Sequence, residues 1–318
     1  MSGGGGLVVA LSGGVGGAKL ALGLARVLPA EELLIVANTG DDFEHLGLSI
    51  SPDLDTLMYA LAGVDNPETG WGRRGETWSF MEALAELGGE TWFRLGDRDL
   101  ATHVERTRRL RAGETLSQVT ATLCRRLGVG PRLLPMSDDR VRTRVDTDEG
   151  WLDFQDWFVR RQCRPVVRAL AFDGAPAARP QPEVMAALQG GGLRAVVICP
   201  SNPLISVEPI LAVPGLREAI HSCGAPVVAV SPIIGGEAVK GPTAKMLREF
   251  GILPSAAAVA RRYGDLLDGY VMDEVDAAEA PAVGVPVTLA RTRMVTLEDR
   301  EALARTVLAA ADALRRAT

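Results

Sequence analysis

The chain has 318 residues, and 47% of them are hydrophobic, so it can bury a full core as one large α/β domain or as a domain with an insertion. A formal net charge of −6 argues against a nucleic-acid-binding protein, whose affinity rests on clustered lysine and arginine side chains. The four cysteines are widely spaced without a CxxC pair, which argues against a zinc ribbon or a disulfide framework and favours a reducing, cytoplasmic setting.

The first predicted unit is a strand, a glycine loop and a helix. Residues 7–11 (LVVAL) form a short apolar run, SGGVGG follows at 12–17, and apolar residues then recur at helical spacing over 20–28. Because the apolar run is interrupted at Ser12, we expect no signal peptide. We also expect no membrane association, since no uncharged apolar stretch approaches the roughly 18 residues of a membrane span.

The glycine loop is a candidate phosphate site, because backbone amides at the start of a helix and the helix dipole create a local positive pole. The spacing fits neither a dinucleotide fingerprint nor a P-loop, because Lys19 replaces the third dinucleotide glycine and lies between Ala18 and Leu20. Four glycines could merely permit a tight turn, but close approach of the backbone to a ligand accounts for all of them. The predicted binding residues here are Gly13, Gly14, Val15, Gly16, Gly17 and Lys19.

A second strand at 33–37 (LLIVA) leads into an acidic segment, NTGDDFEH at 38–45, and SPDLDT follows at 51–56. Because loops at the carboxyl ends of neighbouring parallel strands line one crevice, these acids should face the glycine loop. Acids beside a phosphate site favour a bridging Mg²⁺, which takes oxygen ligands from one or two carboxylates, phosphate and water. The candidate metal ligands are Asp41, Asp42 and Asp55, and Asn38 is a candidate substrate ligand.

Asp53 is the preferred catalytic and substrate-binding residue of this acidic region. Ser51 and Pro52 are typical of a helix start, so Asp53 could instead be an ordinary first-turn acid, but the density of acids favours the functional interpretation. Asp53 and Asp55 are two positions apart and point different ways on a regular helix, which argues against joint ligation of one ion. His45 is expected to be a solvated loop histidine without a catalytic role.

Strands alternating with helices predict a Rossmann-like α/β fold, with a mostly parallel sheet and helices on both faces. Residues 1–90 and 190–318 form the predicted nucleotide-binding core, in which strand signals return at 195–199 and 227–230. Between the two parts, Arg-rich helical stretches replace the strand pattern. We therefore predict a largely helical insertion or cap over residues 91–189.

Near the start of this interval lies GDRD at 96–99, where mixed charges are as readily a solvated ion pair as a binding site. Arg98 is the predicted substrate ligand, because its guanidinium, like that of Arg94, matches phosphate or carboxylate oxygens. Nearby tryptophans could stack on a ring, although buried tryptophans are commonly core residues. They are Trp71, Trp78 and Trp92.

Two later loops also follow predicted strands. CPSNP at 199–203 supplies Ser201 and Asn202, whose short polar side chains can cap a helix or bind phosphate, and both are predicted substrate ligands. GGEAVKGP at 235–242 is a further glycine loop with a lysine. Several such loops at one sheet edge suit a long, polyanionic ligand better than a single phosphate.

These blocks, in this order, resemble the family of 2-phospho-L-lactate transferases (CofD/FbiA) of coenzyme F420 biosynthesis. The resemblance covers nearly the whole chain and rests on SGGVGGAKL paired with NTGDDFEHLGLSISPDLDT, followed by GDRD and CPSNP. It implies a Mg²⁺-dependent transfer of a phospho-acid from a guanosine diphosphate conjugate to the ribityl hydroxyl of 7,8-didemethyl-8-hydroxy-5-deazariboflavin (Fo), with release of GMP. Lactate, enolpyruvate and glycerate conjugates are all compatible with the family.

The resemblance also implies where the substrates lie. The loop at 13–19, with Ser201 and Asn202, should hold the guanosine diphosphate portion, whereas Asp53 and Arg98 should lie on the Fo side. Phosphoryl transfer depends mainly on positioning and charge neutralisation, and an aspartate near the hydroxyl can align it or accept its proton. The family also implies a homodimer. A more distant likeness to YvcK-like regulators, mainly at the first loop, leaves a noncatalytic nucleotide-sugar-binding protein as the alternative.

Overall fold

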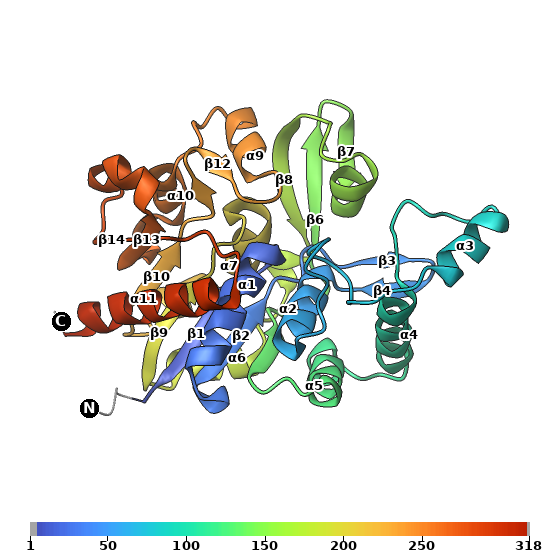
Figure 1. The fold of residues 1–318 in the computed structure, drawn as a ribbon, viewed down its shortest axis with the longest axis horizontal. Coiled ribbons are helices and arrows are strands. Elements are labelled where there is room, and N and C mark those ends of the chain that lie inside the picture. The colour runs from blue at the N-terminus through green and yellow to red at the C-terminus, as the bar shows by residue number, and fades with distance from the viewer. Residues whose placement is uncertain (1–4, 317–318) are drawn as a thin grey trace.

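Seven parallel strands form the centre of the molecule (Figure 1). In the computed structural model, which describes residues 5–316, they lie in the order β14-β13-β10-β9-β1-β2-β5, and each neighbouring pair is parallel. The strands are β1 (Leu7–Ser12), β2 (Leu33–Ala37), β5 (Arg132–Pro135), β9 (Leu193–Ile198), β10 (Val227–Val230), β13 (Gly269–Asp273) and β14 (Val287–Ala290). The Rossmann-like α/β prediction is therefore confirmed.

The sheet is buried on both faces, so its side chains divide between two hydrophobic cores. In β1, Val8 and Ala10 belong to one core, whereas Val9 and Leu11 belong to the other. The exposed fraction of each of these four residues is at most 1%. This two-sided burial is why the central strands read as continuous apolar runs without polar alternation.

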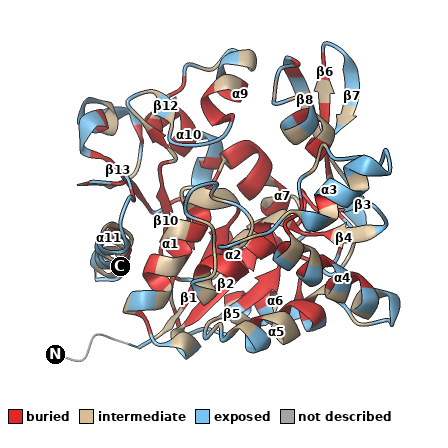
Figure 2. Cartoon of the chain, turned by 45° about the vertical axis from the view of Figure 1, so that its right-hand side comes forward, coloured by how far each residue is buried: buried red, intermediate tan, exposed pale blue. Residues whose placement is uncertain are grey.

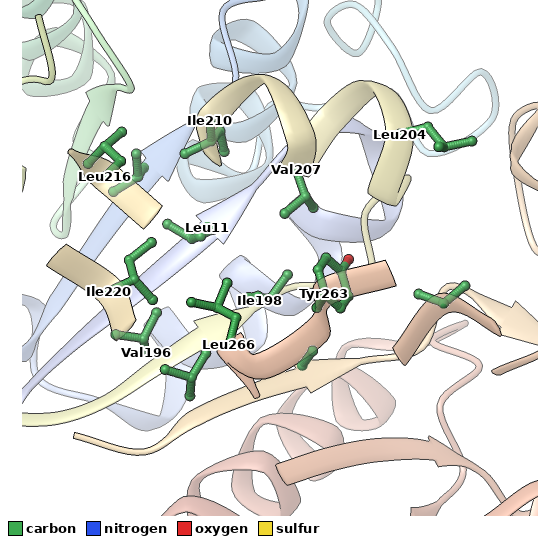
Figure 3. Packing of buried hydrophobic residues seen from close by; sticks show 14 of the residues in the cluster. Leu11, Val196, Ile198, Leu204, Val207, Ile210, Leu216, Ile220, Tyr263 and Leu266 are labelled. Carbon is green, nitrogen blue, oxygen red and sulfur yellow. The ribbon is translucent and has the colours of Figure 1, made fainter. Parts of the chain in front are cut away.

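Helices cover both faces of the sheet. One core is completed by α1 (Gly14–Val27), α2 (Pro52–Ala62), α5 (Leu116–Leu127) and α11 (Leu297–Arg315). The other is completed mainly by α6 (Pro182–Gln189), α7 (Glu208–Leu211), α8 (Leu216–His221), α9 (Thr243–Glu249) and α10 (Ala256–Tyr263). Figure 3 shows side chains of this second core: the labelled residues include Leu11, Val196 and Ile198 from the sheet and Val207, Ile210 and Ile220 from the covering helical segments.

The helix that follows the glycine loop is held between two others, because α1 packs against both α2 and α11 (Figure 1). A Cβ at Gly23 of α1 would collide with the carbonyl oxygen of Arg300, so glycine allows α11 to approach closely there. The start of α11 is fixed by a capping box between Thr296 and Asp299. These contacts position the amino end of α1 at the sheet edge.

The interval 91–189 is more varied than the helical insertion expected there. It contains α4 (Asp97–Arg111), α5 and α6, but it also supplies β5 to the edge of the main sheet. A separate antiparallel sheet has the order β7-β6-β8, with β6 (Arg142–Thr147), β7 (Gly150–Asp153) and β8 (Val167–Asp173). In β6, buried residues alternate with half-buried ones. Two of the half-buried residues are arginines, and their charge makes the strand hard to recognise from the sequence.

A small arm extends from the main sheet (Figure 1). It comprises the hairpin β3 (Phe43–His45) and β4 (Leu48–Ile50), with α3 (Ser79–Glu86) and α4. Ile50, Met81 and Leu95 form its own small buried cluster. Figure 2 shows that buried residues concentrate in the central sheet and its adjoining helices, whereas α3 is largely exposed or half-buried.

Short elements complete the chain. Two are π-helical turns, at Asp156–Arg160 and Pro203–Val207, and the 3₁₀ segments are Ala30–Glu32, Ala175–Ala177, Gly264–Leu266 and Glu274–Ala282. A hairpin is formed by β11 (Ile233–Ile234) and β12 (Glu237–Ala238). Among residues 5–316, no helix has both the length and the apolar character needed to cross a bilayer.

Candidate active site

A cavity of about 650 Å³ opens at the carboxyl edge of the main sheet. The strand order reverses between β1 and β9, and ligands of open α/β sheets bind in the crevice at such a reversal. The loops after both strands, carrying Gly14 and Ser201, line the cavity together with Asp53. The prediction that the glycine loop and the acidic segment share one crevice is confirmed, because the Gly14 N–H donates to the Asp53 carboxylate at 2.7 Å.

The glycines of the first loop serve packing more than the sequence suggested. A Cβ at Gly16 would lie 2.5 Å from the Pro200 carbonyl oxygen, and a Cβ at Gly17 would lie 2.5 Å from the Ser201 hydroxyl. Gly14 differs from them, because it has a φ of +66° and open space where its Cβ would be. The reason predicted for the four glycines is therefore corrected: close approach of protein atoms requires Gly16 and Gly17.

Most of the predicted loop residues still reach the cavity. Its lining includes Gly13, Gly14, Val15, Gly16 and Lys19, whereas Gly17 lies behind it against protein atoms. The Lys19 ammonium donates to the carbonyl oxygen of Met294 at 2.8 Å. Burial, followed by repulsion from Arg300, lowers the pKa of Lys19. A lysine held in this way presents its charge to a ligand at low cost in side-chain entropy.

Ser201 and Asn202, in the loop after β9, have different roles. The Ser201 hydroxyl accepts the Gly13 N–H at 3.1 Å, so it ties the two loops at the strand-order reversal together. The Asn202 side chain accepts the Leu204 N–H at 2.9 Å and caps the π-helical turn that follows. Both line the cavity. The capping interpretation of Asn202 is thus confirmed, and the same residue also lines the cavity.

Asp53 lies in the first turn of α2 and is held by two neutral donors. Besides the Gly14 N–H, its carboxylate accepts the Asn38 side-chain amide at 2.9 Å. Asn38 is itself fixed, because its carbonyl oxygen accepts the Gly40 N–H at 2.8 Å. Burial raises the pKa of Asp53 to about 6, although both hydrogen bonds oppose the shift. Among residues 5–316 no cation pairs with Asp53, which is therefore a carboxylate oriented by neutral donors.

Asp41 and Asp42 are two further buried carboxyls. Burial, followed by repulsion from Asp53, raises the pKa of Asp41 well above its usual range, and burial raises the pKa of Asp42 to about 7. The Ser51 hydroxyl donates to one oxygen of Asp42 at 2.7 Å. Within the described residues, the other oxygen of Asp42 and one oxygen of Asp41 have no hydrogen-bond partner. Asp41 lines both the main cavity and an adjoining one of about 550 Å³, which Asp42 also lines.

Asp55 belongs to a different cluster from Asp41 and Asp42. Its carboxylate pairs with the fully buried guanidinium of Arg106 in α4. It also groups with Asp99 and His103, whose potential ligand atoms all lie within 4.8 Å of one another. Asp55 is therefore already neutralised by Arg106, although it is near enough to Asp42 to add, after burial, to the raised pKa of that carboxyl.

This second cluster contains residues that the sequence did not identify. Tyr59 donates its hydroxyl to Asp99 at 2.7 Å, and His103 Nε2 lies 3.3 Å from the same carboxylate. Tyr59, Asp99 and His103 all line the cavity. The spacing of Asp99 and His103, four residues apart on one helix, was the available signal. It was missed because nothing in the sequence places α4 against α2.

The GDRD segment is correctly placed near the cavity, but Arg98 is exposed and is absent from its lining. One Arg98 nitrogen donates to the carbonyl oxygen of Arg74 at 3.3 Å. Arg94 does line the cavity, and its guanidinium lies 4.1 Å from the ring centre of Trp78. The predicted substrate contact of Arg98 stays a prediction, and in this structure the first turn of α4 places that side chain on the exposed side.

Aromatic side chains form another part of the wall, which includes Trp71, Trp92, Phe93 and Phe158. His45 packs against this group, with its ring centre 5.1 Å from that of Trp92. It is only 5% exposed, and burial lowers its pKa. The prediction of a solvated loop histidine is wrong, because the β3–β4 hairpin turns His45 inward.

Together, the fold and this cavity define a doubly wound α/β protein with its ligand site between a glycine loop and buried carboxylates. A family model described as 2-phospho-L-lactate transferase CofD matches residues 8–308. The chain belongs to the CofD family of transferases.

Related proteins named phosphoenolpyruvate transferase match along nearly their whole length. The one from Streptomyces griseus is 45% identical over 317 residues, covering 97% of this chain and 99% of its own. Those from Streptomyces coelicolor and Thermobifida fusca are 44% and 42% identical, and the matches cover 98% and 96% of this chain and 99% and 97% of theirs.

A crystal structure of a UPF0052 family member from Bacillus halodurans has a similar fold. The TM-score is 0.65 at 15% sequence identity, and the match covers 95% of this chain and 98% of the other. At this identity the likeness concerns the fold alone.

Proposed function

We propose that this protein transfers a phosphoenolpyruvyl group from a guanosine diphosphate conjugate to the terminal ribityl hydroxyl of Fo. The name of its relatives supports enolpyruvate among the three acids compatible with the sequence. The hydroxyl oxygen bonds to the phosphorus that carries the enolpyruvyl group, and the bond from that phosphorus to the bridging oxygen breaks. GMP leaves, and the hydroxyl proton passes to a carboxylate. The product is the dehydro form of F420-0.

The observation that carries this proposal is the direct contact between the glycine loop and a cavity-lining carboxylate. The Gly14 N–H fixes Asp53 at 2.7 Å, beside the amino end of α1 where a phosphate is favoured. An acceptor hydroxyl near Asp53 and a phosphate near the loop would therefore be neighbours. Holding two reactants in this way supplies much of the rate enhancement that phosphoryl transfer requires.

Asp53 is suited to orient the acceptor hydroxyl and take its proton. With a pKa of about 6, it is ionised at neutral pH yet more basic than an ordinary aspartate. Its two hydrogen bonds, from Gly14 and Asn38, come from neutral groups that set its direction. The aromatic wall around Trp92 and Phe158 offers apolar surface for the deazaflavin ring of the same acceptor.

The residues present also fit the Mg²⁺ that we propose as cofactor. Asp41 and Asp42 each keep one buried oxygen without a hydrogen-bond partner in the described part of the chain, and burial raises the pKa of both. A divalent cation would offset the cost of ionising them, and one or two protein carboxylates suffice for Mg²⁺. We leave Asp55 out of this site, because Arg106 already neutralises it. Bound Mg²⁺ would neutralise charge on the transferring phosphoryl oxygens.

The test is GMP release measured with Fo, the enolpyruvyl guanylate and Mg²⁺ supplied together. We expect release only when all three are present, and loss of release on chelation by EDTA that excess Mg²⁺ restores. Parallel reactions with the lactyl and glyceryl guanylates test the choice of acid. The transferase proposal would fail if no donor gave GMP release. If calorimetry then showed tight binding of a nucleotide sugar and no binding of Fo, the protein would instead be a noncatalytic regulator.

A further inference from the structure

Besides Arg94, which packs on Trp78, the cavity is lined by three cations that come from separate parts of the chain. Lys19 is on α1, Lys240 is in the loop after β12, and Arg293 follows β14. None of the three forms an ion pair with an acidic side chain of residues 5–316. The Asp53, Asp55 and Asp99 carboxylates of the same lining are all hydrogen-bonded, whereas Lys19 is held by a neutral group, the Met294 carbonyl oxygen.

These cations are near enough to one another to interact. After burial and Arg300, repulsion from Lys240 and Arg293 is the next cause of the lowered pKa of Lys19. The Lys240 ammonium lies over the glycine loop, since a Cβ at Gly70 would meet both its nitrogen, at 2.5 Å, and the Val15 side chain, at 3.5 Å. Attraction by Asp299 opposes the shift but is the last of its causes, so the cations dominate this side of the cavity. Like charges gathered in a cavity favour binding of an anion.

The sheet order separates these cations from the acids of the cavity. Lys240 and Arg293 come from the half of the sheet that contains β10 and β14, whereas Asp41 and Asp53 come from the half beyond β1 that contains β2. The glycine loop lies between the halves, because it follows β1. The cavity therefore carries cations on the β10–β14 side of the proposed reaction centre and carboxyl groups on the β2 side.

We propose that Lys240 and Arg293, together with Lys19, bind the diphosphate of a guanosine diphosphate ligand and hold it on the β10–β14 side of the glycine loop. This assignment rests on the proposed function, and it adds the residues that fix the donor's orientation. The ammonium groups supply point charges to phosphate oxygens, and the Arg293 guanidinium can engage two oxygens at once. The donor would then present its acid-bearing phosphorus toward Asp53 and the acceptor.

The proposal is tested by calorimetric binding of GDP to the full chain, without Fo. Lys240→Gln and Arg293→Gln should each raise the Kd for GDP about tenfold, with wild-type thermal stability, because each removes a charged contact to phosphate. Lys240→Arg should restore binding to within a few fold. Arg291→Gln is the matched control, since Arg291 is an exposed arginine in the same segment that does not line the cavity.

Two further ligands separate phosphate binding from other effects. Guanosine, which lacks phosphate, should bind wild type and both Gln variants equally, and Fo should do the same. Unchanged GDP affinity in both Gln variants would overturn the proposal, as would an equal loss in Arg291→Gln or weakened binding of Fo instead of GDP. If wild type releases no GMP from any donor but the variants still lose GDP affinity, the transferase proposal fails while the diphosphate site stands.

Discussion

Asp53→Asn should separate activity from stability, because within the described part of the chain no cation pairs with this buried carboxylate. Its pKa lies at about 6 in the folded chain against an ordinary 3.8. The pKa of Asp53 is higher in the folded chain than in the unfolded chain, so protonation of Asp53 favours folding. This contribution to the unfolding free energy is fully present below the unfolded pKa and is lost as pH rises through about 6. The shift corresponds to ~3 kcal/mol of destabilisation above that pH.

The asparagine removes this cost but introduces a smaller one. Its carbonyl oxygen can still accept the Gly14 N–H, whereas its amide faces the Asn38 amide, and a donor left unpaired costs about 1–3 kcal/mol. We therefore expect an unfolding free energy at pH 7.5 equal to wild type or up to ~2 kcal/mol above it. Relative to wild type, the variant should lose ~2 kcal/mol between pH 7.5 and 4.5.

The assays are urea unfolding without divalent ions at the two pH values, and GMP release at pH 7.5. Loss of an oriented proton acceptor should lower turnover by about 100-fold to 10,000-fold. Asp265→Asn is the control, because it makes the same change at a carboxylate that is 79% exposed. A loss of more than ~2 kcal/mol at pH 7.5, or turnover within tenfold of wild type, would refute the reasoning.

Three other substitutions test the packing that supports the site. Gly16→Val should lower the unfolding free energy by about 1–3 kcal/mol, because a Cβ there lies 2.5 Å from the Pro200 carbonyl oxygen; an unchanged urea midpoint would show that the loop has room. Arg106→Met should cost about 3–5 kcal/mol by leaving the Asp55 carboxylate buried without its cation, and a smaller loss on urea unfolding would argue for a hydrated pair. Thr296→Ala should cost about 1 kcal/mol by removing the capping box of α11, with Kd for GDP unchanged in calorimetry; weaker GDP binding would contradict a purely structural role.

The parts of the fold that the sequence predicted are those with a strong local signal. Residues 33–37 and 227–230 were predicted as strands and match β2 and β10, because strands buried on both faces need continuous apolar runs. The crevice was predictable for a related reason: loops that follow neighbouring parallel strands must meet at one sheet edge. Asp53 and Gly14 could therefore be placed together without coordinates.

The parts that were missed depend on tertiary contacts. The pairing of Asp55 with Arg106 joins α2 to α4 across 51 positions, and no local pattern encodes it. The inward turn of His45 depends on the hairpin that carries it, whose strands have only three residues each. The packing role of Gly16 could not be separated from ligand approach, since both require the absence of a Cβ. Each error lies where a distant segment determines a side chain's surroundings.

The most direct test of the central claim is mass spectrometry of both products formed from Fo and the enolpyruvyl guanylate. The proposed attack at the acid-bearing phosphorus predicts dehydro-F420-0 and free GMP in equal amounts. A product in which Fo carries the guanylate, with phosphoenolpyruvate released, would contradict the proposed orientation of the donor. Absence of any Fo conjugate would contradict the reaction itself.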